Sequence, residues 1–164
     1  MFAADEQDDV DVDLNGVVAL ATAVLQAEKV KGDCELAVTF VDEETIAHLN
    51  LEFLGEDKPT DVLAFPIDDE IVESGRSPDS GSTGPDRPDV EPGEVPILLG
   101  DVMVCPAVAA RNAAEHGRST DDEVAMLVVH GILHVLGMDH ADPEEARAMF
   151  AKQDDLLARF HRSR

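Results

Sequence analysis

The sequence predicts an α+β protein folded as a single domain over residues 1–164. A chain of this length fits one domain that buries about two-thirds of its unfolded surface. Hydrophobic residues make up 44% of the chain, enough for a packed core. Segments with the apolar period of strands mix with segments that have the period of helices, and no internal repeat is evident. Aromatic residues make up only 4%, so aliphatic side chains and Phe must form the core.

Two strands, each followed by a helix, are expected in the N-terminal third. Asp and Val alternate over Val10–Leu14, which is the period of a half-buried strand. A helix is expected over Val17–Glu28, with Asn15 as its N-cap. A second strand is expected over Glu35–Val41, and Asp42 can cap the helix that follows it.

The middle of the chain contains a short strand and an insertion. The turn residues at 57–61 lead into the apolar run Val62–Phe65, which Pro66 ends. The segment Ile67–Gly93 is rich in Asp, Glu, Ser, Gly and Pro, and such a composition does not recover its ordering entropy by burial. We therefore expect a mobile acidic insertion over residues 67–94, and a strand resumes at Ile97–Cys105.

Three helices are expected in the C-terminal third. The first runs from Pro106 to about Glu115 and ends at Gly117. The second opens with the capping box Thr120–Glu123 and continues through Leu136, with Gly137 as its stop. The last opens at Asp142–Glu145, and we expect it to pack on the core through its apolar residues, which are Ala146, Phe150, Leu156, Leu157 and Phe160.

Charge and cysteine content restrict the possible functions. The formal net charge is -24, from 36 acidic and 12 basic residues. Such a chain repels phosphate backbones at long range, which disfavours general nucleic-acid binding but allows a local metal-centred site. The acidic N-terminus lacks the pattern of a signal peptide, and Cys34 and Cys105 form no CxxC pair. We expect a cytoplasmic protein with free thiols.

The most informative segment carries three histidines in the pattern HxxxHxxGxxH, at His130, His134 and His140. Residues four apart lie on one face of a helix, so two imidazoles there can converge on one ion. Gly137 can adopt a positive φ and turn the chain so that the third imidazole also reaches it. Almost all neighbouring residues are apolar, and unpartnered buried imidazoles are costly. A zinc-like transition metal bound by these histidines is therefore expected, and His48, His116 and His161 are expected on the surface.

Neighbouring residues bear on the type of site. Three protein ligands leave a position open, as in catalytic zinc sites, whereas structural sites usually have four. Cys105 is a possible fourth ligand, although its spacing does not require this role. Asp139 is either an outer partner of an imidazole N–H or a plain turn residue. Gly131 stands where metallopeptidases of the HExxH type carry their general-base glutamate, which weakens a peptidase interpretation.

The histidine motif resembles that of the YbeY family of bacterial metal-dependent endoribonucleases. The run from His130 to His140 is similar to the family pattern HGxLHLxGxDH, with Val135 in place of a leucine. The segment from Pro59 to Pro66 resembles PTDVLSFP, and Leu99–Val102 resembles LGDI. The resemblance spans roughly Val10 to Phe160, interrupted by the acidic insertion.

The resemblance implies a fold, a cofactor and a role. The implied fold is a small mixed β-sheet covered by helices, and the implied cofactor is one zinc ion held by His130, His134 and His140. The implied activity is cleavage of single-stranded RNA in late ribosomal RNA maturation, at the 3′ end of 16S rRNA, and in ribosome quality control. The implied partners are ribosomal RNA and the small ribosomal subunit or its assembly factors, with no membrane and no DNA.

The chain departs from the family pattern at two places. Many members carry an arginine just before the PTDVL segment, where this chain has Leu54, and the usual serine of PTDVLSFP is Ala64. A cation suits phosphate binding, so substrate contacts must come from elsewhere. The remaining basic candidates are Lys58, Arg111, Arg118, Arg159, Arg162 and Arg164.

Three functional hypotheses follow. The first is a metal-dependent endoribonuclease in which the metal activates water or assists attack by a ribose 2′-OH. The second is a non-catalytic ribosome-assembly factor with a structural metal, which the acidic charge and Leu54 favour. The third is a metallopeptidase, suggested by the histidine spacing alone.

Overall fold

The computed structural model describes residues 1–30, 34–66, 97–138 and 142–161. Its elements follow the order β1 (Phe2–Asp5), α1 (Leu14–Ala27), β2 (Cys34–Phe40), α2 (Glu43–Leu54), β3 (Val62–Pro66), β4 (Ile97–Val104), α5 (Pro106–His116), α6 (Thr120–Val135) and α7 (Pro143–Phe160). The acidic insertion expected over residues 67–94 lies outside the described residues. None of the described helices is long and apolar enough to cross a membrane.

A four-stranded mixed sheet forms the base of the fold, in the order β1-β2-β4-β3. β1 pairs with β2 and β2 with β4 in parallel, whereas β3 runs antiparallel to β4. The pairing of β2 with β4 shifts at Glu35 and Leu36, where Leu98 and Gly100 are the successive partners. The α+β class and the small mixed sheet expected from the sequence are confirmed.

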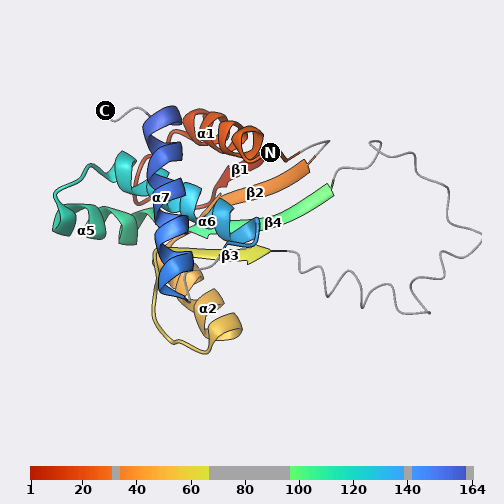
Figure 1. The fold of residues 1–164 in the computed structure, drawn as a ribbon. Coiled ribbons are helices and arrows are strands. Elements are labelled where there is room, and N and C mark those ends of the chain that lie inside the picture. Colours follow the sequence, from red (N-terminus) through yellow and green to blue (C-terminus); the bar gives the residue numbers. More distant parts are fainter. Residues whose placement is uncertain (31–33, 67–96, 139–141, 162–164) are drawn as a thin grey trace, which may run out of the picture.

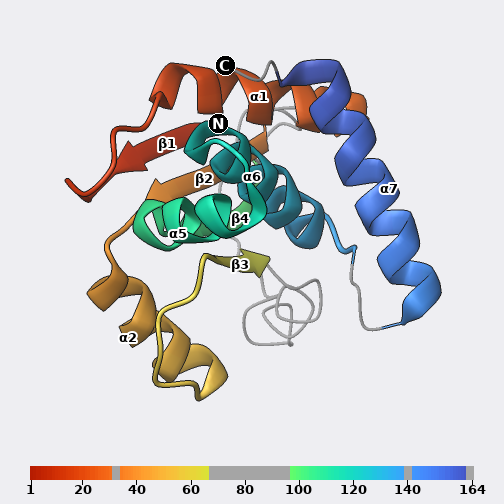
Figure 2. The same cartoon turned by 90° about the vertical axis from the view of Figure 1, so that its left-hand side faces the viewer.

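Helix α6 is the central helix of the fold. It contacts α5, α7, α1, β3 and β4, and Figures 1 and 2 show it lying against the sheet with α1 and α7 beside it. The main core lies between these elements and includes Leu36, Val102, Val128 and Ile132. This burial explains why residues of α6 are apolar nearly all round.

A second, smaller core anchors α2 beyond β3. It consists of Val41, Ile46, Leu63 and Cys105. The buried amide of Asn50, on the same helix, donates to the carbonyl of Lys58 at 2.9 Å and so holds the loop that leads into β3. Figure 2 shows α2 set apart from α1 and α7. Asp42 caps this helix as predicted, accepting from the Thr45 N–H at 2.8 Å.

Two expectations for the N-terminal region are wrong. The first strand is Phe2–Asp5, and Val10–Asp13 form the connection to α1 rather than a strand. In this connection the Gln7 side chain accepts from the Val10 N–H and donates to the Val10 carbonyl, which organises a turn. Asp13, not Asn15, is the N-cap of α1, because its carboxylate accepts from the Gly16 N–H at 3.0 Å. The alternation of Asp and Val over Val10–Leu14 thus belongs to a turn and a helix cap rather than to a strand.

The C-terminal helices differ from expectation in smaller ways. The N-cap of α6 is Ser119, one residue before the expected capping box, and it accepts from the Asp122 N–H. Helix α7 packs on the core through Met149 and Leu156, but Phe150 is 45% exposed and was wrongly placed in the core. Gln153, about one turn further along α7, is buried instead of Phe150.

Candidate metal centre

The histidine helix ends at the predicted glycine. Gly137 has a φ of 100°, its N–H bonds to the His134 carbonyl, and the Met138 N–H bonds to the Leu133 carbonyl. This pair of hydrogen bonds is a Schellman motif, which satisfies the last carbonyls of the helix and reverses the chain. Helix α6 therefore ends in a tight turn at Gly137 and Met138, close to His134.

His130 and His134 converge as the spacing predicts. Both are only partly exposed and stand within a run of buried α6 residues. Their Nε2 atoms lie 3.1 Å apart, and their ring centroids are 4.6 Å apart with planes inclined at 80°. The two rings thus present one nitrogen each to the same point in space.

This geometry fits a transition-metal ligand pair. Two nitrogens bound tetrahedrally to one zinc ion, each about 2.0–2.1 Å from it, lie roughly 3.3 Å apart. The observed 3.1 Å is close to that separation. His140 and Asp139, the third predicted ligand and its neighbour, lie outside the described residues. Among the residues that are described, no group of three or more His, Cys, Asp or Glu side chains is placed to hold a metal ion.

Two residues of α7 complete the surroundings of His130, and neither was predicted. The Nδ1 atom of His130 lies 2.8 Å from Oε1 of Gln153, which is buried. The ring of Phe150 is nearly parallel to that of His130, at 16°, with centroids 6.0 Å apart. A signal for Gln153 exists in the sequence: it shares the helical face of Met149 and Leu156, and a polar residue on an apolar face is informative.

Gly131 is required by packing rather than by chemistry. A Cβ atom at this position would lie 2.5 Å from Cγ1 of Val102 on β4, which is closer than real Cβ contacts. The position faces the sheet and is buried. A glutamate could not be accommodated there without moving α6 off the sheet, so the general base of an HExxH peptidase has no place in this packing.

Cys105 does not join the histidines. It belongs to the small core beside α2, and burial raises the pKa of its thiol above the ordinary value. A metal-binding cysteine is a thiolate, whose formation this burial disfavours. Within the described part of the chain, the possibility of Cys105 as a fourth ligand therefore finds no support.

The basic candidates in the described residues are all engaged with acidic groups. Lys58 pairs with Glu56, Arg111 with Glu43, Arg118 with Glu123 and Arg159 with Asp155. Arg162 and Arg164 lie outside the described residues. Leu54, at the position where the resemblance implies an arginine, is 64% exposed at the end of α2.

The remaining histidines are solvated or paired outside the centre. His48 and His116 are exposed, as expected. His161 was expected on the surface but is only partly exposed, because its Nε2 lies 2.9 Å from Oδ1 of Asp122 in the first turn of α6.

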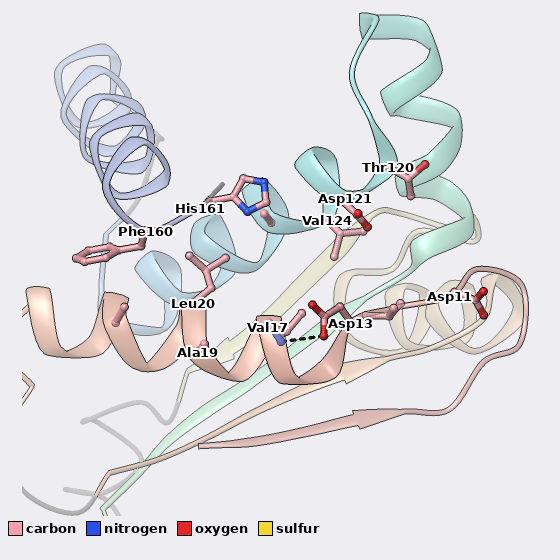
Figure 3. Close-up of a pocket in the computed structure, with 14 residues that line it drawn as sticks. Asp11, Asp13, Val17, Ala19, Leu20, Thr120, Asp121, Val124, Phe160 and His161 are labelled. Carbon is pink, nitrogen blue, oxygen red and sulfur yellow. Dashed lines mark hydrogen bonds between the residues drawn. The ribbon is translucent and has the colours of Figure 1, made fainter. Parts of the chain in front are cut away.

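Among the described residues, two of the cavities lie along α6, and they differ in their relation to the histidine pair. One, of about 470 Å³, lies between α1, the start of α6 and the end of α7, as Figure 3 shows, with Leu20, Val124 and Phe160 in its wall. The other, of about 610 Å³, lies between α6 and α7 and is lined by Phe150 and Gln153 together with Arg118 and Asp122. Only the second includes residues that touch His130.

Comparison with known proteins gives a consistent assignment. The model of the family described as Endoribonuclease YbeY matches residues 2–161. The chain is 45% identical over 154 residues to an Endoribonuclease YbeY of Salinispora tropica, covering 94% of this chain and 92% of that protein. It is 44% identical over 154 residues to one of Thermobifida fusca, covering 94% and 90%. The solution structure of TM1509 from Thermotoga maritima matches with a TM-score of 0.59 and 28% identity, covering 96% and 87%.

Proposed function

The chain belongs to the Endoribonuclease YbeY family, and we propose that it cleaves RNA at a metal centre built on His130, His134 and His140. It is a hydrolase that acts on phosphodiester bonds within RNA chains, and its role is in ribosomal RNA processing. The observation that supports the metal centre is the convergence of two imidazole nitrogens, 3.1 Å apart, on one face of α6.

Each described residue of the centre has a definite task. His130 and His134 offer their Nε2 atoms to the ion, and the Schellman turn at Gly137 reverses the chain ahead of His140. Burial of α6 against β4 keeps the histidine pair rigid, because Gly131 lets the helix approach Val102 closely. Zinc held by three histidines supplies Lewis-acid chemistry to a phosphodiester. Asp139, next to His140 in the sequence, is a candidate outer partner of a ligand.

The acidic charge shapes how the substrate is reached. A net charge of -24 repels RNA at long range, and the described basic candidates are paired with carboxylates. We propose that the enzyme acts in the cytoplasm on single-stranded ribosomal RNA presented by the small subunit or its assembly factors, at the 3′ end of 16S rRNA and in ribosome quality control. In this arrangement the ribosomal particle, rather than the enzyme's own surface, concentrates the substrate.

A direct test combines metal analysis with RNA cleavage. Purified protein is expected to hold one zinc ion per chain and to cleave single-stranded ribosomal RNA, and a chelator should abolish cleavage until zinc is restored. His48→Ala is the matched control, because its side chain is 77% exposed and outside the centre. Full cleavage by protein that holds no metal would overturn the proposal. A 2′,3′-cyclic phosphate on the product would identify ribose attack.

The non-catalytic alternative is favoured by one observation, the exposed Leu54 at the place of the family arginine. In that case the metal would serve the fold, and the protein would act as an assembly factor. A His134→Ala variant that stays folded separates the two possibilities. If it restores ribosome assembly in cells that lack the protein, the catalytic function is excluded; if it fails while His48→Ala succeeds, the enzyme function stands.

A further inference from the structure

We infer that Gln153 of α7 is a positioning residue for the metal centre, fixing the orientation and the tautomer of His130. The inference rests on the proposed function, because it assigns Gln153 a task toward the ion that His130 is proposed to bind. The Gln153 side chain is a polar group in the apolar packing of α7, with the residue 5% exposed. Burying an amide without hydrogen-bond partners costs free energy. The buried position of Gln153 therefore depends on the hydrogen bonds that its side chain makes.

The hydrogen bond determines which nitrogen of His130 is available. Oε1 of Gln153 is an acceptor, so at 2.8 Å the Nδ1 atom of His130 is the donor. In a neutral imidazole with its proton on Nδ1, the lone pair is on Nε2. That atom is the one that lies 3.1 Å from Nε2 of His134. The bond to Gln153 therefore prepares the nitrogen that faces the second ligand.

A neutral acceptor also suits the chemistry of the ligand. Metal-binding histidines commonly donate their other N–H to a carboxylate, a carbonyl or a water, which sets the ring orientation. An amide oxygen performs this task without adding another charge to a chain that already carries -24. Asp154 and Asp155 follow Gln153 in the sequence, and both are exposed. The buried contact with His130 is made by the amide of Gln153.

Packing holds the positioning group in place. Gln153 lies between Met149 and Leu156, which are 0% and 1% exposed and fix α7 against the core. The Phe150 ring, stacked at 16° to His130, restricts rotation of the imidazole from the same helix. Figures 1 and 2 show α7 passing beside α6, so two separate helices determine the geometry of one ligand.

The test measures zinc affinity and tautomer on full-length variants. Gln153→Leu removes the acceptor and keeps the volume, whereas Gln153→Glu keeps an acceptor oxygen. We expect Gln153→Leu to weaken zinc binding about 10–100-fold in a chelator competition and Gln153→Glu to bind within about threefold of wild type. Ile46→Val is the packing control, because Ile46 is buried in the separate small core beside α2. It should change the melting temperature of the metal-free protein but not the zinc affinity.

A second readout uses the metal-free protein. Nitrogen NMR of the imidazoles should place the His130 proton on Nδ1 in wild type and in Gln153→Glu, and should show mixed tautomers in Gln153→Leu. Folded Gln153→Leu with wild-type zinc affinity, or a wild-type proton on Nε2, would overturn the inference. Wild type that binds no zinc would instead refute the metal centre, and the tautomer would still decide whether Gln153 positions His130.

Discussion

The histidines at the two ends of α6 have different hydrogen-bond partners. At the C-terminal end His130 is bonded to the neutral amide of Gln153 and faces His134 across 3.1 Å. At the N-terminal end His161 lies 2.9 Å from the carboxylate of Asp122, beside the cavity drawn in Figure 3. That end carries Asp121, Asp122 and Glu123 in its first turn, where negative charge complements the helix dipole.

The difference in partners distinguishes His161, which stabilises the fold locally, from His130, the candidate metal ligand. A partly exposed imidazole beside a carboxylate, like His161 beside Asp122, contributes little more than local stability. At the other end, Gln153 accepts from Nδ1 of His130, so the lone pair of Nε2 faces His134 and can bind a metal. The chemical environment, rather than the residue type, thus decides which end of α6 is the candidate active centre. Substitutions at the two ends of α6 should therefore have different consequences.

Loss of a ligand should have the largest effect. We expect His130→Ala and His134→Ala to lower RNA cleavage about 10³-fold or more, because several kcal/mol of charge stabilisation by the metal is lost. Zinc content should fall in parallel. The matched control at the opposite end is His161→Ala, which should keep zinc and activity. Equal losses in all three variants would remove the contrast between the two ends.

Enlarging Gly131 should have the next largest effect. Gly131→Glu would place a carboxylate against Val102 in the core and lower the free energy of unfolding by about 3 kcal/mol or more. Gly131→Ala should be milder, because overpacking of about 1–3 kcal/mol is partly offset by a gain in helix propensity of roughly 1 kcal/mol. Urea unfolding measures both. Val102→Ala should rescue Gly131→Ala, and strictly additive effects would argue against the contact.

Removing the N-terminal cap should cost stability without affecting the centre. We expect Ser119→Ala to lower the free energy of unfolding by about 1 kcal/mol, because the Asp122 N–H loses its acceptor. Ser119→Asp supplies another capping oxygen and should restore stability in thermal unfolding. Zinc affinity should be the same in both variants. A change in zinc affinity would show that the two ends of α6 are coupled.

Breaking the His161–Asp122 pair should have the smallest effect. The side chains are 21% and 28% exposed, so we expect a coupling energy of roughly 0.2–1 kcal/mol that shrinks at high salt. A double-mutant cycle of His161→Ala and Asp122→Asn measures it. A larger coupling energy that resists salt would show that this histidine is more than a surface partner.

Local signals in the sequence predicted much of the fold. Strands β2, β3 and β4 and helices α2, α5 and α7 lie where periodicity and capping residues placed them, within a residue or two. The first strand was missed because four residues, Phe2–Asp5, carry too little pattern to be recognised. They form a strand because β2 offers them a parallel partner, which is a contact between distant segments. The alternation at Val10–Leu14 was misleading because aspartates also serve turns and caps.

The convergence of His130 and His134 and the turn at Gly137 were predictable from the chain alone, because helical spacing and the positive φ open to glycine are local properties. Packing between elements, in contrast, brings Gln153 to His130, requires a small residue at Gly131 against Val102 and leaves Phe150 exposed. These outcomes depend on how α7 and β4 pack on α6. Packing joins residues that the sequence keeps far apart, and no local pattern records the distance between them.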